Sequence, residues 1–261
     1  MTPRDGPGSI SDRISHPLGV ERLARAGYLC VRCADRDDYH DGNLLWLERA
    51  PAAGSLAGWL EVWRRELGVF PGVRRIQLRW ETGDAAQADD ALASEVTALG
   101  GSLAQHPGLV LGALVEPARP ADVAVRELVP GDWPAVLALH REEAVADAHR
   151  VFLEWAVAGS RALVAAGRAH FWGAFDRDTL AGAAGLCAEG GHAALCEVAT
   201  ARAFRRRGIA ATLCHRALEA HLRRRPADAV VVVAEPGEAT RLYQRLGFLP
   251  ASRVWTFSRA A

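Results

Sequence analysis

The sequence predicts an α+β fold in which a mixed, mostly antiparallel central sheet is flanked by helices, with a related lobe preceding it in the chain. The first observation is a series of apolar, strand-like segments joined by turn formers such as Asp176-Arg-Asp-Thr179 and Gly190-Gly191, which indicates hairpins. The second is the helical spacing of apolar residues at 151–166 and 208–225. The third is the uninterrupted apolar run 229–234, typical of a strand covered on both faces.

A proline-containing segment, residues 116–122, separates two parts of the chain. Its two prolines lie between the apolar strand at 108–115 and another that begins at Val123. We therefore expect an N-terminal α/β lobe over residues 1–119 and a second domain over residues 120–261.

The second part is expected to contain a strand, two helices, three antiparallel strands, a helix, a strand, a helix and a strand. Its first strand begins at Val123, and its first helix follows Asp132, a candidate N-cap, and runs to about Glu143. The later elements are expected as a helix at 151–166, strands at 170–175, 180–187 and 193–200, a helix at 208–225, a strand at 229–234, a helix at 238–246 and a strand at 252–257.

The first part contains a weaker copy of the end of this series. A strand at 75–84, a helix ending at Leu99-Gly100 and a strand near 109–114 repeat the order that starts at Val230 and passes a helix end at Leu246-Gly247. A Glu-x-Gly-acid turn occurs in both. The repeat indicates tandem copies of one fold, and a chance match of short patterns is the alternative.

Composition excludes several classes of protein. The 261 residues include 31 basic and 31 acidic side chains, so the formal net charge is zero, and half of the residues are hydrophobic. This balance is ordinary for a globular protein and argues against disorder and against bulk polyanion binding. The sequence has no lysine, which excludes a Schiff-base lysine, a Walker A lysine and a kinase ATP lysine.

Cysteine usage and hydropathy bear on the compartment. We see neither a signal-peptide core near Met1 nor an apolar run long enough for a membrane span, so we expect a cytoplasmic protein. Five cysteines in mostly apolar surroundings suit reduced, buried thiols. Cys30 and Cys33 form a C-x-x-C before several acidic residues, but no second ligand pair completes a tetrahedral set. We expect a strand followed by a polar loop there, and no metal.

The most informative segment is an apolar strand, a basic loop, a glycine and a helix start, over residues 195–213. Such a loop directs backbone N–H groups outward at the positive end of the helix dipole, and the arginines add charge. Gly208 permits close approach of a phosphate or a positive φ. The P-loop and the G-x-G-x-x-G pattern are both absent, so the loop predicts a phosphate site of another kind.

The stretch Arg205-Arg-Arg-Gly208-Ile-Ala210 matches R-x-x-G-x-[GA], and with it the C-terminal half resembles the GNAT superfamily of N-acetyltransferases. The resemblance spans Val123 to Phe257 and includes Val198-Ala-Thr200 before the loop and Arg241-Leu-Tyr-Gln-Arg-Leu-Gly-Phe248 after the next strand. It implies a GNAT-like sheet over 120–261. The N-terminal lobe would then be a degenerate GNAT-like copy without a cofactor loop, giving one coenzyme A (CoA) site per chain.

The resemblance also implies a cofactor site and an acid. The strand end would pair its backbone with the pantetheine amides of acetyl-CoA, and the loop would receive the pyrophosphate. The residues so assigned are Val198, Ala199, Thr200, Arg205, Arg206, Arg207, Gly208, Ile209, Ala210 and Ala211. Tyr243 matches the family tyrosine that protonates the leaving thiolate. Pro236 stands where many members have an asparagine that contacts CoA, which puts that contact in doubt.

The implied reaction is direct attack of an amine on the acetyl thioester in a ternary complex, which requires a base. Glu197 is the candidate, but strand alternation places it on the face opposite Cys196, so a structural role is preferred unless a bulge rotates it. Cys196 is not expected to be a nucleophile, because no His–Asp pair is placed to activate it. The helical segment before this strand carries further groups that could attract a cationic amine or simply face solvent: His140, Glu142, Glu143 and Asp147.

The expected partner is a small-molecule or peptide amine, with no membrane. A non-catalytic acyl-CoA sensor is the alternative function. Two observations argue against nucleic-acid binding. The net charge is zero, and the basic run 223–225 lies at a helix C-terminus, where it complements the helix dipole. The tryptophans at 46, 59, 63 and 80 are expected in the core of the first lobe, with an interface as the alternative. The oligomeric state stays open, and a homodimer is compatible with the sequence.

Overall fold

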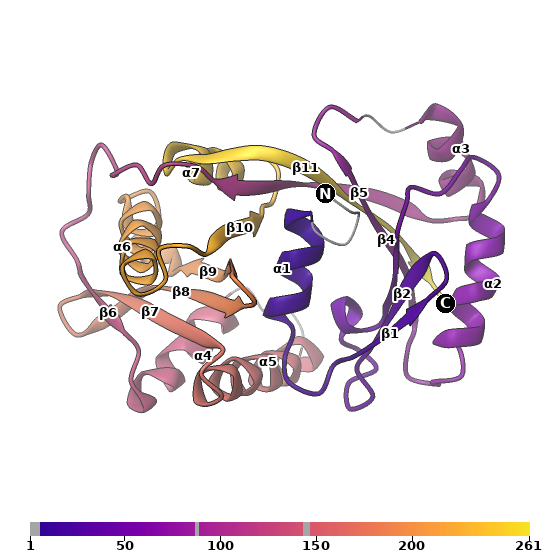
Figure 1. Cartoon of the computed structure of the whole chain (residues 1–261). Coiled ribbons are helices and arrows are strands. Elements are labelled where there is room, and N and C mark those ends of the chain that lie inside the picture. Colours follow the sequence, from indigo (N-terminus) through magenta and orange to yellow (C-terminus); the bar gives the residue numbers. More distant parts are fainter. Residues whose placement is uncertain (1–5, 87–88, 143–146) are drawn as a thin grey trace.

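One mixed sheet runs through both halves of the protein (Figure 1). The computed structural model describes residues 6–86, 89–142 and 147–261. Its strands are β1 (Glu21–Arg25), β2 (Tyr28–Arg32), β3 (Leu44–Leu47), β4 (Arg75–Gly83), β5 (Ser102–Leu111), β6 (Ala124–Glu127), β7 (Ala169–Asp176), β8 (Thr179–Glu189), β9 (His192–Thr200), β10 (Ala229–Val233) and β11 (Phe248–Ala260). Across the sheet they follow the order β1-β2-β3-β4-β11-β5-β10-β9-β8-β7-β6.

Helices cover this sheet and divide its core. They are α1 (Pro7–Ser15), α2 (Leu56–Glu66), α3 (Asp90–Ala98), α4 (Trp133–Arg141), α5 (Asp147–Ala165), α6 (Ile209–Arg224) and α7 (Glu238–Arg245), with short 3₁₀ turns at His40–Gly42, Pro130–Asp132 and Arg202–Phe204. In the C-terminal half, one apolar cluster lies under α6 and α7 and another under α4 and α5. A third cluster fills the N-terminal half under α2 and α3.

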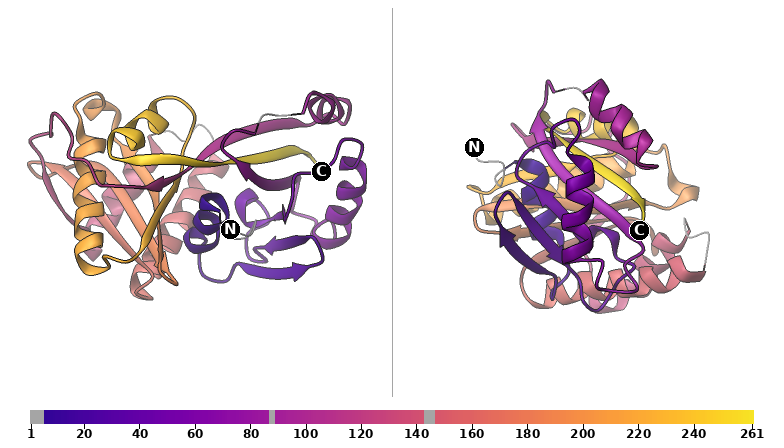
Figure 2. Two further views of the ribbon diagram at one scale, coloured as in Figure 1. Left: turned by 45° about the horizontal axis from the view of Figure 1, so that its top comes forward. Right: turned by 90° about the vertical axis from the view of Figure 1, so that its right-hand side faces the viewer.

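β5 and β11 cross between the two halves. They pair antiparallel from Phe248↔Leu111 to Ser258↔Ser102. β11 also pairs with β4 over 252–260, while the end of β5 pairs with β10 over 108–110. The last strand of the C-terminal half therefore completes the N-terminal sheet, and the last strand of the N-terminal half lies inside the C-terminal sheet. Figures 1 and 2 show these two strands as a long ribbon that joins the lobes.

β10 lies in the interior of the sheet, as its composition predicts. Val230 and Val232 belong to the cluster under α6, whereas Val231 belongs to the cluster under α4 and α5. All three side chains are at most 2% exposed. A strand with apolar neighbours on both faces needs no polar alternation, so the prediction from the run 229–234 is confirmed.

α1 lies between the lobes, and no helix was expected there from the sequence. The carboxylate of Glu81 in β4 accepts from the backbone N–H groups of Gly8 (2.8 Å) and Ser9 (3.1 Å), which satisfies the first turn of the helix. Ile10 and Ile14 are buried in the C-terminal core. The spacing of these two isoleucines was the available sign of a helix.

Most of the predicted elements of residues 123–261 are confirmed, and the differences have physical causes. β11 begins at Phe248 rather than at 252 because it pairs with β5, and the same pairing lets β5, in the first part of the chain, begin at Ser102 rather than near 109. Asp132 does not cap α4. Its carboxylate instead accepts from the N–H of Val129 (2.7 Å) and pairs with Arg126 (2.6 Å), which holds the turn before the helix.

The tryptophans expected in the first lobe do lie in or against its core. Trp63 and Trp80 are each 1% exposed, Trp46 is 5% exposed, and Trp59 packs partly buried at the edge of the cluster. Cys30 belongs to the same core on β2, and burial raises the pKa of its thiol to about 11. Among the described helices, none has the length and apolar character that crossing a membrane requires.

Candidate functional site

The two central strands of the C-terminal half separate along their length. β9 and β10 pair in parallel only from Ala229↔His192 to Val231↔Ala194. Beyond that point β10 continues against β5, whereas β9 continues against β8 alone. The segment 195–200 of β9 therefore has one edge without a strand neighbour in the described structure. This opening is where a ligand chain could add to the sheet.

A β-bulge lies in this free segment. Between the pairs Gly185↔Cys196 and Ala183↔Ala199, β9 advances three residues while β8 advances two. Glu197 takes up the difference with φ +50°. This is the bulge that the sequence analysis named as the exception to simple alternation, and with it Glu197 and Cys196 line one cleft. Half of the Glu197 side chain is exposed, and its Oε2 lies 3.8 Å from Nε2 of His140.

A cavity of about 530 Å³ opens at the start of α6. It brings together seven of the ten residues predicted to hold the cofactor: Thr200, Arg205, Arg206, Gly208, Ile209, Ala210 and Ala211. Gly208 adopts φ +78°, and a Cβ there would lie 3.1 Å from the carbonyl oxygen of Arg119. The helix begins immediately after this glycine, so its first N–H groups and dipole favour an anion in the cavity.

The loop arginines are held by neighbours. Arg206 pairs with Glu238, and Arg205 donates from Nε to the carbonyl of Thr200 (3.2 Å). Arg207 turns away from the cavity, because it pairs with Asp176 (3.0 Å) and lies over the ring of Phe204.

Two further arginines, Arg241 and Arg245, line the opposite wall of the cavity from α7. They are not among the residues that the sequence predicts for the cofactor. Their spacing of four residues, which puts both on one helix face, was the available sign.

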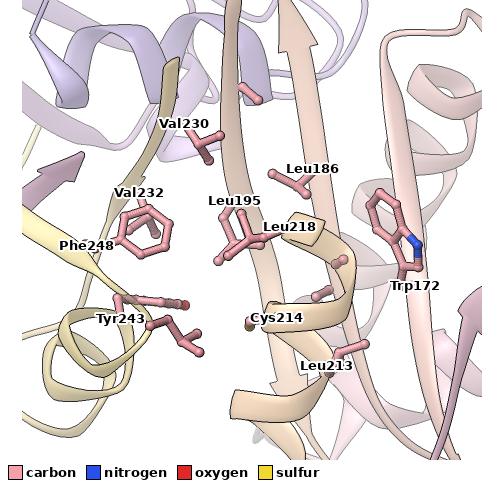
Figure 3. Packing of buried hydrophobic residues seen from close by; sticks show 14 of the residues in the cluster. Trp172, Leu186, Leu195, Leu213, Cys214, Leu218, Val230, Val232, Tyr243 and Phe248 are labelled. Atoms are coloured by element: carbon pink, nitrogen blue, oxygen red, sulfur yellow. The ribbon is translucent and has the colours of Figure 1, made fainter. Parts of the chain in front are cut away.

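Tyr243 occupies a different position from the other predicted residues. It is 6% exposed and packs edge-to-face on Phe248 at 5.8 Å. Figure 3 shows its hydroxyl directed from α7 toward Cys214 of α6, inside the apolar cluster. Burial, with smaller contributions from Cys214 and Cys196, raises the pKa of Tyr243, so it keeps its proton near neutral pH. Val198 and Ala199, like Tyr243, are not among the residues that line the cavity.

A second cavity, of about 540 Å³, lies between the lobes; we call it the central cleft. Carboxylates from several elements line it: Asp12, Asp41, Glu197 and Glu235. The bulged strand β9 thus borders both cavities, with Glu197 in the central cleft and Thr200 in the cavity at α6.

One arginine on β4 organises the wall of this cleft opposite Glu197. Arg79 forms ion pairs with Asp12 and Asp41, each at 2.6 Å. Burial opposes its charge, but Asp41 and Asp12 outweigh burial and raise the pKa of Arg79. Desolvation likewise opposes ionisation of Asp41, but Arg79 lowers its pKa below the usual value. His16 is buried, which lowers its pKa and favours the neutral ring.

The other groups named near the acceptor in the sequence, one histidine and three carboxylates, have different surroundings. His140 lies beside Glu197, as stated above. Glu142 accepts from the backbone N–H of Arg202 (2.7 Å) and so fixes the turn after β9. Glu143 and the side chain of Asp147 fall outside the described residues.

The N-terminal lobe has a helix start of its own, at α2. Glu95 of α3 accepts from the N–H groups of Gly54 (2.7 Å) and Leu56 (2.9 Å). An internal carboxylate therefore already occupies the place where an anion would bind this helix. Within the described ranges, no group of three or more His, Cys, Asp or Glu residues could hold a metal ion.

Comparison with known proteins relates the C-terminal half to a protein family. Residues 137–256 match the family model of the acetyltransferase (GNAT) domain. A search of curated proteins found no significant match. A GCN5-related N-acetyltransferase from Kribbella flavida has 18% identity and a TM-score of 0.65, over 97% of this chain and 96% of that one. A tandem GNAT protein from the clavulanic acid biosynthesis pathway has 17% identity and a TM-score of 0.59, over 100% and 90%.

A protein of unknown function from Staphylococcus epidermidis has 12% identity and a TM-score of 0.75, over 93% of this chain and 95% of that one. At these identities the three structures establish the fold alone. Each spans almost the whole of both chains, so the tandem arrangement of the two lobes is shared with known structures.

Proposed function

Because the C-terminal half of this chain carries a GNAT acetyltransferase domain, we propose that the protein transfers an acetyl group from acetyl-CoA directly to an amine. One observation carries the proposal. The free segment of β9 borders the cavity at the start of α6 at Thr200 and the central cleft at Glu197. A donor whose pyrophosphate lies at α6 and whose pantetheine follows β9 would present its thioester between the two cavities.

The residues at α6 suit a pyrophosphate. The cavity combines a helix N-terminus, a glycine with positive φ and arginines from two sides, Arg205 and Arg206 from the loop and Arg241 and Arg245 from α7. Charge-assisted hydrogen bonds from guanidinium groups are among the stronger contacts to phosphate. Val198 and Thr200 would pair with the pantetheine amides through their backbone.

Glu197 and Tyr243 are proposed as base and acid. The deprotonated amine nitrogen attacks the thioester carbonyl carbon, and the C–N bond forms as the C–S bond breaks. Before the attack, Glu197 takes one proton from the ammonium group and then passes it to solvent. After the attack, the nitrogen loses a second proton to solvent, and Tyr243 gives its proton to the CoA thiolate. A proton from solvent restores Tyr243, so one proton is released overall. The products are an amide and free CoA.

The division of labour between the halves is also proposed. Residues 120–261 would hold the donor, and residues 1–119 would supply one wall of the acceptor cleft through Asp12, Asp41 and Arg79. With Glu95 on the start of α2, we expect one CoA site per chain. The five cysteines are free thiols, which favours a reducing compartment such as the cytoplasm.

The test is transfer itself. The purified protein is incubated with acetyl-CoA and a panel of amines, and free thiol and acetylated amine are measured in parallel. We expect the two products to appear in equal amounts. Calorimetric binding of CoA without transfer to any amine would support a sensor instead of an enzyme.

A further inference from the structure

A small side chamber opens from the central cleft. Its cavity has a volume of about 190 Å³. Five residues line both spaces, so the two are continuous: Ser15, Tyr39, Asp41, Cys196 and Glu197. The base proposed for the reaction therefore lies at the mouth of the chamber.

Three aromatic rings meet in the wall of this chamber. Tyr39 lies 5.0 Å from Trp155 and 5.9 Å from Phe152, and the last two rings lie 5.7 Å apart. Tyr39 comes from the loop after β2, and the other two come from α5, more than one hundred residues later. All three side chains line the cavity and are only partly buried, so their ring surfaces are accessible from it.

The size of the chamber suits a single ring. A protein cavity of about 150 Å³ lined by apolar side chains accommodates benzene. The chamber is slightly larger, and Phe171 and Leu163 extend its apolar wall. Arg36 lies over the ring of Trp155 at 5.5 Å and forms an ion pair with Asp38 (2.7 Å), so the aromatic cluster already has a cation–π partner from within the protein. The aromatic wall is therefore suited to contact an apolar group of a ligand rather than its charged group.

In contrast to the apolar wall of the chamber, its mouth carries negatively charged side chains. Asp41 and Glu197 line both spaces and have 57% and 50% of their side chains exposed. The wider cleft adds Asp12 and Glu235, so that four carboxylates face one arginine, Arg79, and two histidines, His16 and His106, the latter 3.3 Å from Glu235. A protonated amine at the mouth would face two carboxylates within reach of solvent.

From this juxtaposition we infer that the acceptor is a primary monoamine with one aromatic ring, or an apolar group of that size, near its ammonium group. The ring enters the chamber of Tyr39, Phe152 and Trp155, and the ammonium group lies between Asp41 and Glu197. The inference rests on the proposed acetyl transfer and specifies its acceptor.

The experiment measures kcat and KM for phenethylamine, ethanolamine, spermidine and phenylalanine amide at saturating acetyl-CoA. Phenethylamine should exceed ethanolamine in kcat/KM by about tenfold or more, since one buried ring contributes at least the energy of a tenfold factor. A preference for phenylalanine amide over phenethylamine would assign the site to the N-terminus of a peptide and overturn the inference of a simple monoamine. A preference for spermidine would overturn it as well.

Variants separate the chamber from the catalytic machinery. Trp155→Ala and the milder Phe152→Leu should raise KM for phenethylamine, about tenfold for the first, and leave KM for ethanolamine within twofold. Val151→Ala removes an exposed side chain from the same helix and should change neither. Thermal unfolding and CoA calorimetry of each variant show that the fold and the donor site are intact.

The two levels of the proposal fail differently. The acceptor assignment is overturned if ethanolamine and phenethylamine are acetylated with the same efficiency and Trp155→Ala remains active toward both. Acetyl transfer itself would still stand. Absence of transfer to every amine would overturn the proposed function itself.

Discussion

Replacing Gly208 by alanine tests the placement of the donor site. Gly208 has φ +78°, immediately before α6, and lies in the wall of the cavity proposed for the pyrophosphate. A non-glycine residue in the left-handed region costs about 1–2 kcal/mol. The new Cβ would also lie 3.1 Å from the carbonyl of Arg119, so the linker behind the helix must give way slightly.

If alanine lets the free loop relax out of the left-handed region, CoA binding must restore that conformation, and the cost then appears in the affinity. Because 1.4 kcal/mol corresponds to a tenfold change in Kd, the Kd of CoA should rise by roughly fivefold to thirtyfold. Calorimetry with CoA, whose free thiol prevents turnover, measures this directly. Thermal unfolding measured in parallel reports the effect on the fold.

Gly167→Ala is the matched control. Gly167 follows α5, has φ +68° and would place its Cβ in open space, so it carries the same intrinsic backbone cost at a position remote from the cavity. It should lower stability by a similar amount and leave CoA affinity unchanged. Wild-type affinity in Gly208→Ala, with a smaller loss of stability than in the control, would show a relaxed loop that does not affect CoA binding and would refute the placement of the donor.

Four further outcomes follow from the geometry. Glu197→Gln should lower kcat by about 10²-fold or more and leave CoA affinity unchanged, as measured by steady-state kinetics and calorimetry. An unchanged kcat would contradict the assignment of Glu197 as the base. Ile14→Ala, which truncates a side chain 1% exposed, should cost about 2–5 kcal/mol in urea unfolding, whereas Leu18→Ala at a 47% exposed position should cost little. Burial lowers the pKa of His16 below its unfolded value, so its contribution to stability is present above pH 6.5 and falls as the pH drops below it; unfolding at pH 7.5 and 5.5 should show this slope, reduced in His16→Gln. Glu95→Ala should cost about 1 kcal/mol and leave CoA stoichiometry at one per chain, and a stoichiometry of two would show that the carboxylate alone blocks a second site.

Local patterns were sufficient for most of the C-terminal half. The run 229–234, the helix at 208–225 and the turn at Gly190-Gly191 were predictable because each depends on residues adjacent in the chain. The cavity at α6 was predictable for the same reason, since strand, loop and helix start are contiguous. Arg241 and Arg245 on its far wall belong to another helix, and no local pattern relates the two elements.

The rest depends on contacts between distant segments. Alternation alone gave Glu197 the wrong face, because a bulge is set by the pairing of β9 with β8 and not by the sequence of β9. The aromatic chamber joins Tyr39 to Phe152 and Trp155, and the wall of the cleft joins Asp12 to Arg79. No spacing rule connects such residues, and only the packed structure brings them together.

The positions of β5 and β11, each in the sheet of the other half, also determine when the N-terminal sheet can be completed during synthesis. β11 lies between β4 and β5 in the sheet, yet it is made about 140 residues after β5, later than every other described strand. While the chain emerges from the ribosome, β4 and β5 have edges with no permanent neighbour, and such edges are the usual starting points of aggregation. The N-terminal half must therefore wait, incomplete, for residues 248–260 before its sheet can close.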